Sequence, residues 1–186
     1  MRAFVLILLV SLSGCAVFQE KITDYDQRST VYGWLDTKDL KPNHLYAINL
    51  YQHRPATDKP YYGMSFVKMD GGYLVYSHIP PNGAFKLDSL HGQNCLLFLC
   101  GNTTYSYNLG KQGDIGTVVI RKPGVYYLGS FKLSDVKTGW FEPGKFKVEA
   151  VKGPTQQAML ERVLQEAPSE YPVVGLRIEK KLENLK

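Results

Sequence analysis

Residues 62–79 read YGMSFVKMDGGYLVYSHI, two apolar-rich runs that meet at Asp70-Gly71-Gly72. The runs Tyr62 to Met69 and Tyr73 to Ile79 are rich in aromatic and β-branched residues, which favour strands. Glycine accepts a positive φ without a steric penalty, so the Asp-Gly-Gly triplet is a strong signal for a tight turn. This stretch therefore predicts a β-hairpin.

Strand-like patterns continue on both sides of this hairpin. Leu45 to Tyr51 is mostly apolar on both faces, as in a central strand. Further on, Phe85, Leu87 and Ser89 alternate with Lys86 and Asp88, so that the two sets are expected on opposite faces.

Two later stretches extend the β pattern. Ile115 to Arg121 and Val125 to Leu133 flank Lys122-Pro123-Gly124, which predicts a second hairpin. Lys145 to Ala150 alternates charged and apolar residues, the pattern of a sheet with one face in water. About ten strands at this spacing, without a βαβ rhythm, indicate an antiparallel sandwich or barrel, and we expect the β-sandwich.

One helix is expected over residues 155–167. Thr155 can cap its first turn, and Pro168 stops it. Its apolar stripe has helical spacing and consists of Met159, Leu160, Val163, Leu164 and Ala167. The polar face is not basic enough for a membrane surface, so we expect the stripe to pack on the sandwich. A last strand is expected over Val173 to Glu179.

The composition is that of an ordinary globular domain. The chain has 186 residues, of which 44% are hydrophobic and 21% charged, and this excludes a disordered or fibrous protein. The formal charge of +5 is modest and spread along the chain, so nucleic acid is not an expected partner.

The first residues have the pattern of an export signal. Met1-Arg2 is a short basic start, and Ala3 to Leu12 is an apolar run broken only by Ser11. Ten helical residues span roughly 15 Å, which is half of what a bilayer core requires. The run is therefore expected to be a signal-peptide apolar region and not a membrane span.

The motif that ends this region is Leu12-Ser13-Gly14-Cys15, which resembles the lipobox of bacterial lipoproteins. The resemblance implies that residues 1–14 are removed and that Cys15 becomes the acylated first residue of a 172-residue mature chain. Ala16 stands where Asp would signal retention at the inner membrane, so the outer membrane, facing the periplasm, is implied. The alternative is a plain signal peptide with Cys15 near its cleavage point.

The domain organisation follows from these patterns. We expect a signal peptide over residues 1–14, a lipidated tether over 15–29, and a single β-sandwich domain over 30–186. Two phrases, GAFKLDSL at 83–90 and PGVYYL at 123–128, resemble strands of the transthyretin-like sandwich found as a regulatory domain beside carboxypeptidases. That resemblance implies a domain that binds and scaffolds and does not catalyse.

Cys95 and Cys100 are the remaining cysteines. In an oxidising compartment such a pair is usually a disulfide. In one extended strand their Cα atoms would lie roughly 16 Å apart, beyond the ~7 Å limit for a bridge. The segment is therefore either an apolar loop closed by a disulfide or a core strand with two buried thiols, and the compartment favours the disulfide. If exposed, Leu96, Leu97, Phe98 and Leu99 would form a docking point for a membrane or a partner.

Catalytic and metal-binding motifs are not apparent in the sequence. The four histidines occur singly, without ligand spacing, and no nucleophile elbow or phosphate-binding loop is present. We therefore expect no cofactor, no metal site and no catalytic residues. A small hydrolase would have to use carboxylates such as Asp70, Asp88 or Glu142, which form no paired motif.

Tyrosines are the remaining candidates for binding. Many lie on expected strands, namely Tyr61, Tyr62, Tyr73, Tyr76, Tyr105, Tyr107, Tyr126 and Tyr127. Exposed rings can stack on sugars or grip a peptide, whereas buried rings only fill strand positions. The sequence therefore predicts a non-enzymatic, lipid-anchored envelope protein that binds a protein partner, with a glycan- or peptidoglycan-binding module as the alternative.

Overall fold

The computed structural model describes residues 24–96, 99–113, 115–138, 145–166 and 172–185. Within these residues most of the chain is in strands, and two α-helices lie near the C-terminal end. The elements are η1 (Tyr25–Gln27), β1 (Ser29–Asp39), β2 (His44–Arg54), β3 (Tyr61–Gly63), β4 (Ser65–Met69), β5 (Gly72–Ile79), β6 (Gly83–Leu96), β7 (Leu99–Asn108), η2 (Leu109–Gln112), β8 (Val118–Ile120), β9 (Val125–Val136), β10 (Lys145–Ala150), α1 (Gln156–Glu166) and α2 (Pro172–Glu183).

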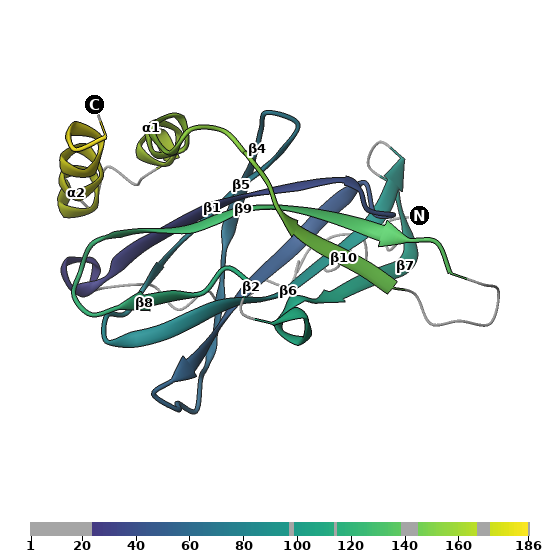
Figure 1. Cartoon of the computed structure of the whole chain (residues 1–186), viewed down its shortest axis with the longest axis horizontal. Coiled ribbons are helices and arrows are strands. Elements are labelled where there is room, and N and C mark those ends of the chain that lie inside the picture. Colours follow the sequence, from purple (N-terminus) through teal and green to yellow (C-terminus); the bar gives the residue numbers. More distant parts are fainter. Residues whose placement is uncertain (1–23, 97–98, 114, 139–144, 167–171, 186) are drawn as a thin grey trace, which may run out of the picture.

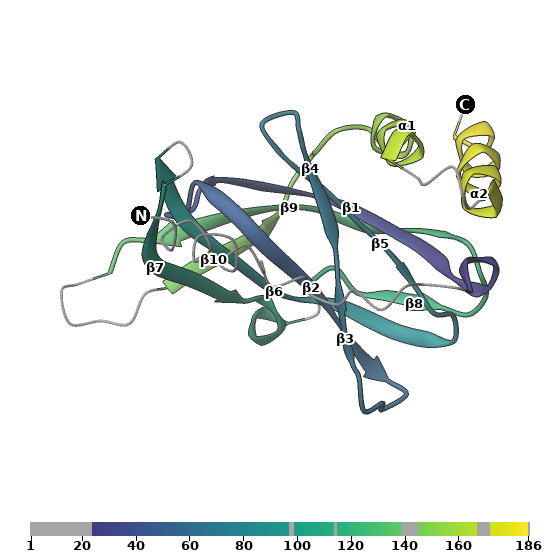
Figure 2. The same cartoon turned by 180° about the vertical axis from the view of Figure 1, so that it is seen from behind.

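The strands form two sheets that pack face to face (Figures 1 and 2). Sheet A has the order β10-β9-β1-β5-β4, and sheet B has the order β3-β2-β6-β7, with β8 paired to the start of β6. Among the described strands every pairing is antiparallel except that of β1 with β9, which is parallel. The expected mainly β fold, a sandwich with a short helix packed on it, is confirmed.

The hairpin around Asp70-Gly71-Gly72 forms between β4 and β5, as the sequence predicts. Met69 pairs with Gly72, and Asp70 and Gly71 have φ values of 48° and 75°. Two positive φ values in succession are what a two-residue type I′ turn requires, and Asp-Gly supplies them at little steric cost.

The run before this hairpin changes sheets at Met64. Tyr61 to Gly63 forms β3 and pairs with β2 in sheet B, whereas Ser65 onward forms β4 in sheet A. The buried Met64 lies at the crossing, and its N–H donates to the carbonyl oxygen of Ile48 at 2.8 Å. The single strand expected from Tyr62 to Met69 is therefore two short strands in different sheets.

The second hairpin, expected around Lys122-Pro123-Gly124, does not form. β8 pairs with β6 in sheet B, while β9 pairs with β1 and β10 in sheet A. The turn carries the chain from one sheet to the other. Proline and glycine reverse the chain in either arrangement, so the local sequence does not decide which neighbour a strand receives.

Two apolar cores hold the layers together. The larger core lies between the sheets and includes Val31, Leu35, Ile48, Leu50, Val75, Ile79, Phe85, Leu87, Leu90, Ile120 and Leu133. The smaller core lies between the outer face of sheet A and the helices, and consists of Tyr32, Trp34, Leu74, Met159, Leu160, Val163, Val174 and Ile178. Figure 1 shows the two helices gathered at one end of the sandwich.

The helix α1 packs on the sandwich, as its apolar stripe predicts. The hydroxyl of Thr155 accepts the N–H of Ala158 at 3.1 Å, which is the expected cap. Met159 and Leu160 are fully buried against sheet A. The buried Tyr32 of β1 donates its hydroxyl to Oε1 of Gln156 at 2.9 Å. Burial raises the pKa of this tyrosine.

The strand expected over Val173 to Glu179 is wrong, because these residues belong to α2. Pro172 occupies the first helical position, where its missing N–H costs nothing. Val174 and Ile178 lie four positions apart and are buried in the smaller core. Their helical spacing overrides the local β-propensity of valine and isoleucine because it buries both side chains on one face. Among the described helices, none is long and apolar enough to span a membrane.

The segment just before β1 is fastened to the domain. Arg177 of α2 donates from Nη1 to the carbonyl oxygen of Arg28 at 2.8 Å and from Nη2 to that of Asp26 at 2.6 Å. Arg28 pairs with Asp24, Nε to Oδ1 at 2.8 Å, and this bond holds the pKa of the Asp24 carboxyl below its ordinary value. Of the tether expected over residues 15–29, the described part therefore lies on the domain.

His78 lies beside this junction and is largely buried. Its Nδ1 is 3.1 Å from Oγ1 of Thr30, and its ring contacts the rings of Tyr25 and Tyr76 edge-on. Arg28 donates from Nη1 to the carbonyl oxygen of His78 at 3.2 Å. Burial, and then the positive charge of Arg28, lower the pKa of His78 from 6.5 to about 4. The imidazole is therefore neutral at pH 7.

We expect acid to destabilise the fold through His78. Because the pKa is lower in the folded chain, the unfolded chain binds the proton first, and stability is lost as the pH falls from about 6.5 toward 4. The slope approaches ~1.4 kcal/mol per pH unit where only the unfolded histidine is charged. Urea unfolding of the full-length protein between pH 6.5 and 4 measures this loss of unfolding free energy. His78→Gln should flatten the profile and His44→Gln, at an exposed histidine, should not; equal profiles would contradict the assignment.

Candidate functional site

Cys15 and the leader residues 1–14 lie outside the described residues. The first described residue is Asp24, whose side chain is part of the junction with Arg28 and α2. The lipid anchor is thus still a prediction from the sequence, and the structure supplies the point at which residues 15–23 join the domain.

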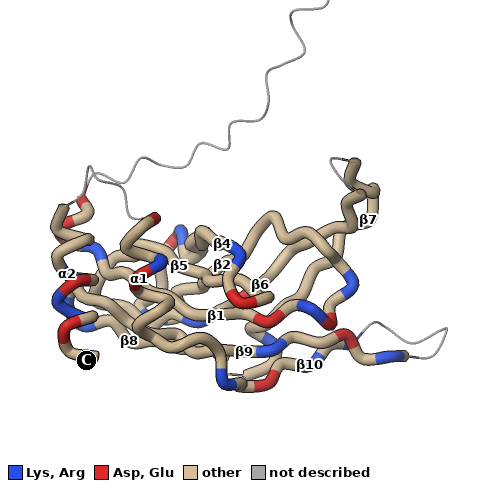
Figure 3. The backbone as a smooth tube through the Cα atoms, turned by 90° about the horizontal axis from the view of Figure 1, so that it is seen from above, with Lys and Arg blue, Asp and Glu red and all other residues tan. Residues whose placement is uncertain are grey.

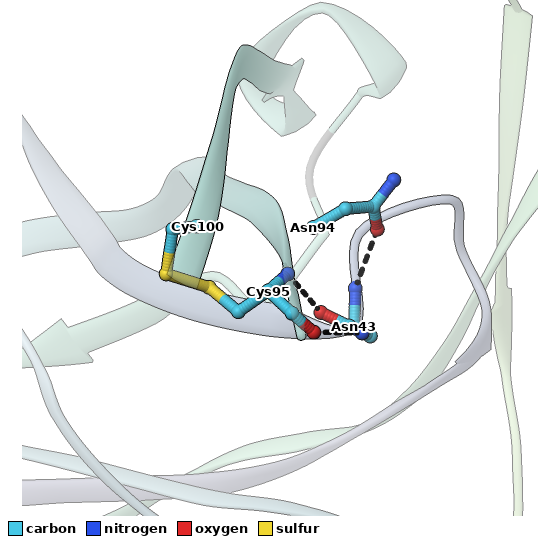
Figure 4. Close-up of a disulfide and its surroundings, with 4 residues drawn as sticks. All are labelled: Asn43, Asn94, Cys95 and Cys100. Atoms are coloured by element: carbon cyan, nitrogen blue, oxygen red, sulfur yellow. Dashed lines mark hydrogen bonds between the residues drawn. A yellow bond between two sulfur atoms is a disulfide. The ribbon is translucent and has the colours of Figure 1, made fainter. Parts of the chain in front are cut away.

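Cys95 and Cys100 form a disulfide across the hairpin of β6 and β7 (Figure 4). They are direct cross-strand partners, and the next pair toward the tip is Leu96 with Leu99. Of the two arrangements left open by the sequence, the disulfide-closed loop is therefore the one that forms. The chain-entropy model gives about 2 kcal/mol of stabilisation for closing a loop of this length.

Asn43, in the turn between β1 and β2, holds this hairpin from the side (Figure 4). Its Oδ1 accepts the N–H of Cys95, and its Nδ2 donates to the carbonyl oxygen of the same residue, both at 2.8 Å. The backbone N–H of Asn43 donates to Oδ1 of Asn94 at 3.2 Å. One asparagine therefore satisfies both backbone groups of the residue at which the disulfide begins.

The tip of the hairpin exposes large apolar side chains. Leu96 is 78% exposed and Leu99 is 68% exposed, while Leu97 and Phe98 lie outside the described residues. Residues 89–110 contain no Asp, Glu, Lys or Arg, and Figure 3 shows the protruding hairpin without charged positions. The docking loop expected from the sequence is thus exposed at its two described positions.

A hollow of about 360 Å³ lies on sheet B. Its lining comes from β3, β2, β6 and β7, so it crosses the sheet from edge to edge: Tyr61, Asn49, Asp88, Ser89, His91, Ser106, Tyr107 and Asn108. The alternating apolar residues of β2 and β6 face the core between the sheets, which places the polar residues of these strands on the outer face.

Cross-strand hydrogen bonds fix the polar residues of this hollow. Asn49 donates from Nδ2 to Oγ of Ser89 at 3.2 Å, and Asn108 is the backbone partner of Ser89 on the other side. Two pairs further along β6, Nδ1 of His91 lies 3.0 Å from Oγ of Ser106. Amide, hydroxyl and imidazole groups therefore follow one another across three strands.

Two β-bulges flank the hollow. In the pairing of β2 with β6, Leu45 faces Gly92 and Ala47 faces His91, so Tyr46 is the extra residue on β2. In the same way, Asp88 is the extra residue on β6, because its neighbours Ser89 and Leu87 pair with consecutive residues of β2. A bulge re-aims the side chains beside it and is over-represented next to functional sites.

The bulge at Asp88 corrects the strict alternation that the sequence suggests for this strand. Alternation places Ser89 on the same face as Phe85 and Leu87. In the structure Ser89 bonds to Asn49 beside the hollow, and the next residue, Leu90, enters the core instead. Two polar residues in succession before a buried leucine were the only local signal of this shift.

Most of the tyrosines considered for binding are partly or fully buried. Tyr61 is the exposed one, at 61%, and Tyr46, which the sequence analysis did not single out, is 45% exposed. The other seven are Tyr62, Tyr73, Tyr76, Tyr105, Tyr107, Tyr126 and Tyr127, all of which pack against one of the two cores. Among the described tyrosines, the two exposed ones, Tyr46 and Tyr61, both lie on sheet B.

The carboxylates considered for hydrolysis are not brought together. Asp88 lies on β6 of sheet B, whereas Asp70 lies in the β4–β5 turn of sheet A and lines a separate hollow of about 510 Å³. Glu142 lies outside the described residues. Within the described part of the chain, no group of three or more His, Cys, Asp or Glu side chains is placed to hold a metal ion.

We expect Asn43→Ala to loosen the disulfide hairpin. The substitution removes both side-chain hydrogen bonds to Cys95, at a cost of about 1–2 kcal/mol. The amide of Cys95 should then exchange with deuterium at least several-fold faster, which hydrogen exchange by NMR measures. Asn102→Ala, at an exposed position of the same hairpin, is the matched control. Equal exchange rates in both variants would show that the Asn43 bonds are not formed in solution.

Comparison with known proteins assigns no family. No family model matches this chain, and no curated protein matches its sequence. The interpretation of its two prominent features, the disulfide hairpin and the polar hollow on sheet B, therefore depends on their own residues.

Proposed function

We propose that this protein is a lipid-anchored component of a bacterial envelope, held at the outer membrane and facing the periplasm, which binds a protein partner and does not catalyse a reaction. The observation on which this proposal mainly rests is the disulfide-closed apolar hairpin at Cys95 and Cys100. A disulfide in a small domain is typical of an exported protein, which agrees with the lipobox-like residues before Cys15.

The anchor would hold the domain close to the bilayer. Acyl chains on Cys15 contribute ~0.8 kcal/mol for each buried methylene group, so two or more chains bind almost irreversibly. The segment from Cys15 to Asp24 spans nine residues, or about 30 Å when fully extended. Confinement to such a thin layer raises the effective concentration of the domain, which allows weak contacts with a neighbouring protein to operate.

The position of the hairpin favours a protein, and not the bilayer, as its binding partner. Ser29, the first residue of β1, pairs with Ile79, which precedes the start of β6 at Gly83. The anchored segment therefore joins the domain at the end of the molecule where β6 begins. From Gly83 to Leu96, β6 extends about 43 Å at the usual rise of a strand. Figures 1 and 3 show the β7 tip at the opposite end of the molecule from α2. A domain tethered at one end presents the other end away from the membrane.

The hairpin is built as a fixed apolar contact. The disulfide and the two bonds from Asn43 fix the backbone, so little conformational entropy is lost when Leu96 and Leu99 are covered. Burial of two leucines provides roughly 3–6 kcal/mol before the costs of association. Such a contact suits an apolar surface on another envelope protein.

Cys15→Ser should abolish acylation. Only a thiol carries the thioether-linked lipid, so cells fed radioactive palmitate should label the original protein and not the variant. Cys95→Ser, which removes a cysteine elsewhere in the chain, is the control and should keep its label. Continued labelling of Cys15→Ser would contradict the anchor.

A photo-cross-linking residue at position 96 should capture a protein in intact cells. The same residue at position 176, where Leu176 is 62% exposed on α2 near the junction, should capture lipid instead. Leu99→Asp should reduce the adduct at position 96 several-fold, because it places a charge in the apolar contact. Lipid adducts at position 96, or a protein adduct indifferent to Leu99→Asp, would contradict the proposed contact.

A further inference from the structure

The hollow on sheet B is lined by groups suited to a neutral ligand that is rich in hydroxyls. Its side chains are amides, hydroxyls, an imidazole and one carboxylate, and no Lys or Arg is among them. A phosphate or nucleic-acid site would need basic side chains, and the carboxylate of Asp88 repels anions. Both donors and acceptors are present, as pairing with hydroxyl groups requires.

An exposed aromatic ring stands at one edge of the hollow. Tyr61 on β3 lines it and is 61% exposed, and its ring is supported by that of Tyr51, with 5.3 Å between the centroids. A tyrosine held in this way offers a large apolar face at low cost in rotamer entropy. Tyr46 of β2, which is 45% exposed, stacks on His91 of the lining, with 6.2 Å between the ring centroids. Rings next to hydroxyl-pairing groups match a sugar, which has an apolar ring face and a polar rim.

The fold keeps Asp88 available to such a ligand. Asp88 is the extra residue of its bulge, and in the described part of the chain no side chain or backbone group pairs with its carboxylate. Gly110 lies directly beside the carboxylate of Asp88, as shown by the distance of 2.8 Å that a Cβ at Gly110 would have to Oδ1 of Asp88. Lys86 is held by the carbonyl oxygen of Gly110 at 3.3 Å. The carboxylate is therefore left open to accept hydrogen bonds from outside.

The shape of the hollow suits an extended ligand. It crosses four strands, and three intervals between neighbouring strands amount to about 14 Å. Asn49, Ser89, His91 and Ser106 are already ordered by their mutual hydrogen bonds, so binding would cost little reorganisation.

From these observations we infer that the outer face of sheet B, across the hollow between Tyr61 and Asn108, is a binding site for a short stretch of a neutral carbohydrate chain. The sugar ring stacks on Tyr61, and neighbouring hydroxyls bond to the carboxylate of Asp88 and to the amides and hydroxyls of β2, β6 and β7. This site uses residues 88–91 and 106–108 of β6 and β7, whereas the proposed protein contact uses the tip of the same hairpin at Leu96 and Leu99, and the site does not depend on the lipid anchor.

The test uses the full-length, isotope-labelled protein in a detergent without a sugar headgroup. The probes are three tetrasaccharides, of β1,4-linked N-acetylglucosamine, β1,4-linked glucose and α1,4-linked glucose, each titrated to millimolar concentration. At least one should shift, in a saturable manner, the amide signals of β2, β6 and β7 around the hollow. No saturable shift with any of the three, or shifts confined to another surface, would overturn the inference.

Variants assign the binding to named side chains. Asp88→Ala and Tyr61→Ala should each weaken the affinity about tenfold or more, since each removes a direct contact. Asp26→Ala removes an exposed carboxylate elsewhere, and Leu176→Ala removes an apolar side chain of similar exposure; both should bind as the original protein does. Unchanged affinity in both hollow variants would overturn the inference. If either variant fails to fold, the inference is tested by the amide-signal shifts of the unaltered protein alone.

Discussion

The burial of β1 on both of its faces is the constraint on which the rest of the structure depends. Val31 and Leu35 point into the core between the sheets, while Tyr32 and Trp34 point into the smaller core under the helices. The strand lies in the middle of sheet A, between β5 and β9. Sheet A therefore needs cover on two sides, which sheet B provides on one face and α1 and α2 on the other.

The same arrangement explains why sheet B carries the candidate ligand site. Its inner face closes the larger core, and the two described α-helices pack on sheet A, so that neither of them covers the polar outer face of sheet B. The bulges at Tyr46 and Asp88 adapt the long strands β2 and β6 to each other, and they add side chains to that open face. These β-bulges thus place polar and aromatic side chains in or beside the hollow.

The two ends of the molecule have different structural characters. At one end, Arg177 and Arg28 join the first described residues to α2 through charge-assisted bonds to backbone carbonyls and to Asp24. At the other end, residues 89–110 of the β6–β7 hairpin include no Asp, Glu, Lys or Arg, and the hairpin is held by a covalent bridge and by Asn43. This difference between the two ends matches the proposed roles, in which the anchor lies near one end and the apolar protein contact lies at the other.

The amino-acid sequence by itself determined the features that depend on residues a few positions apart: the type I′ turn at Asp70-Gly71, the cap and apolar stripe of α1, and the mainly β composition of the domain. It also limited the state of Cys95 and Cys100 to two alternatives. Only the tertiary structure decided that Met64 and the 122–124 turn pass between sheets, and that Val173 to Glu179 is helical. The physical reason is that sheet membership, bulges and the choice between strand and helix are set by the surfaces that each segment buries, and those surfaces come from residues far away in the chain.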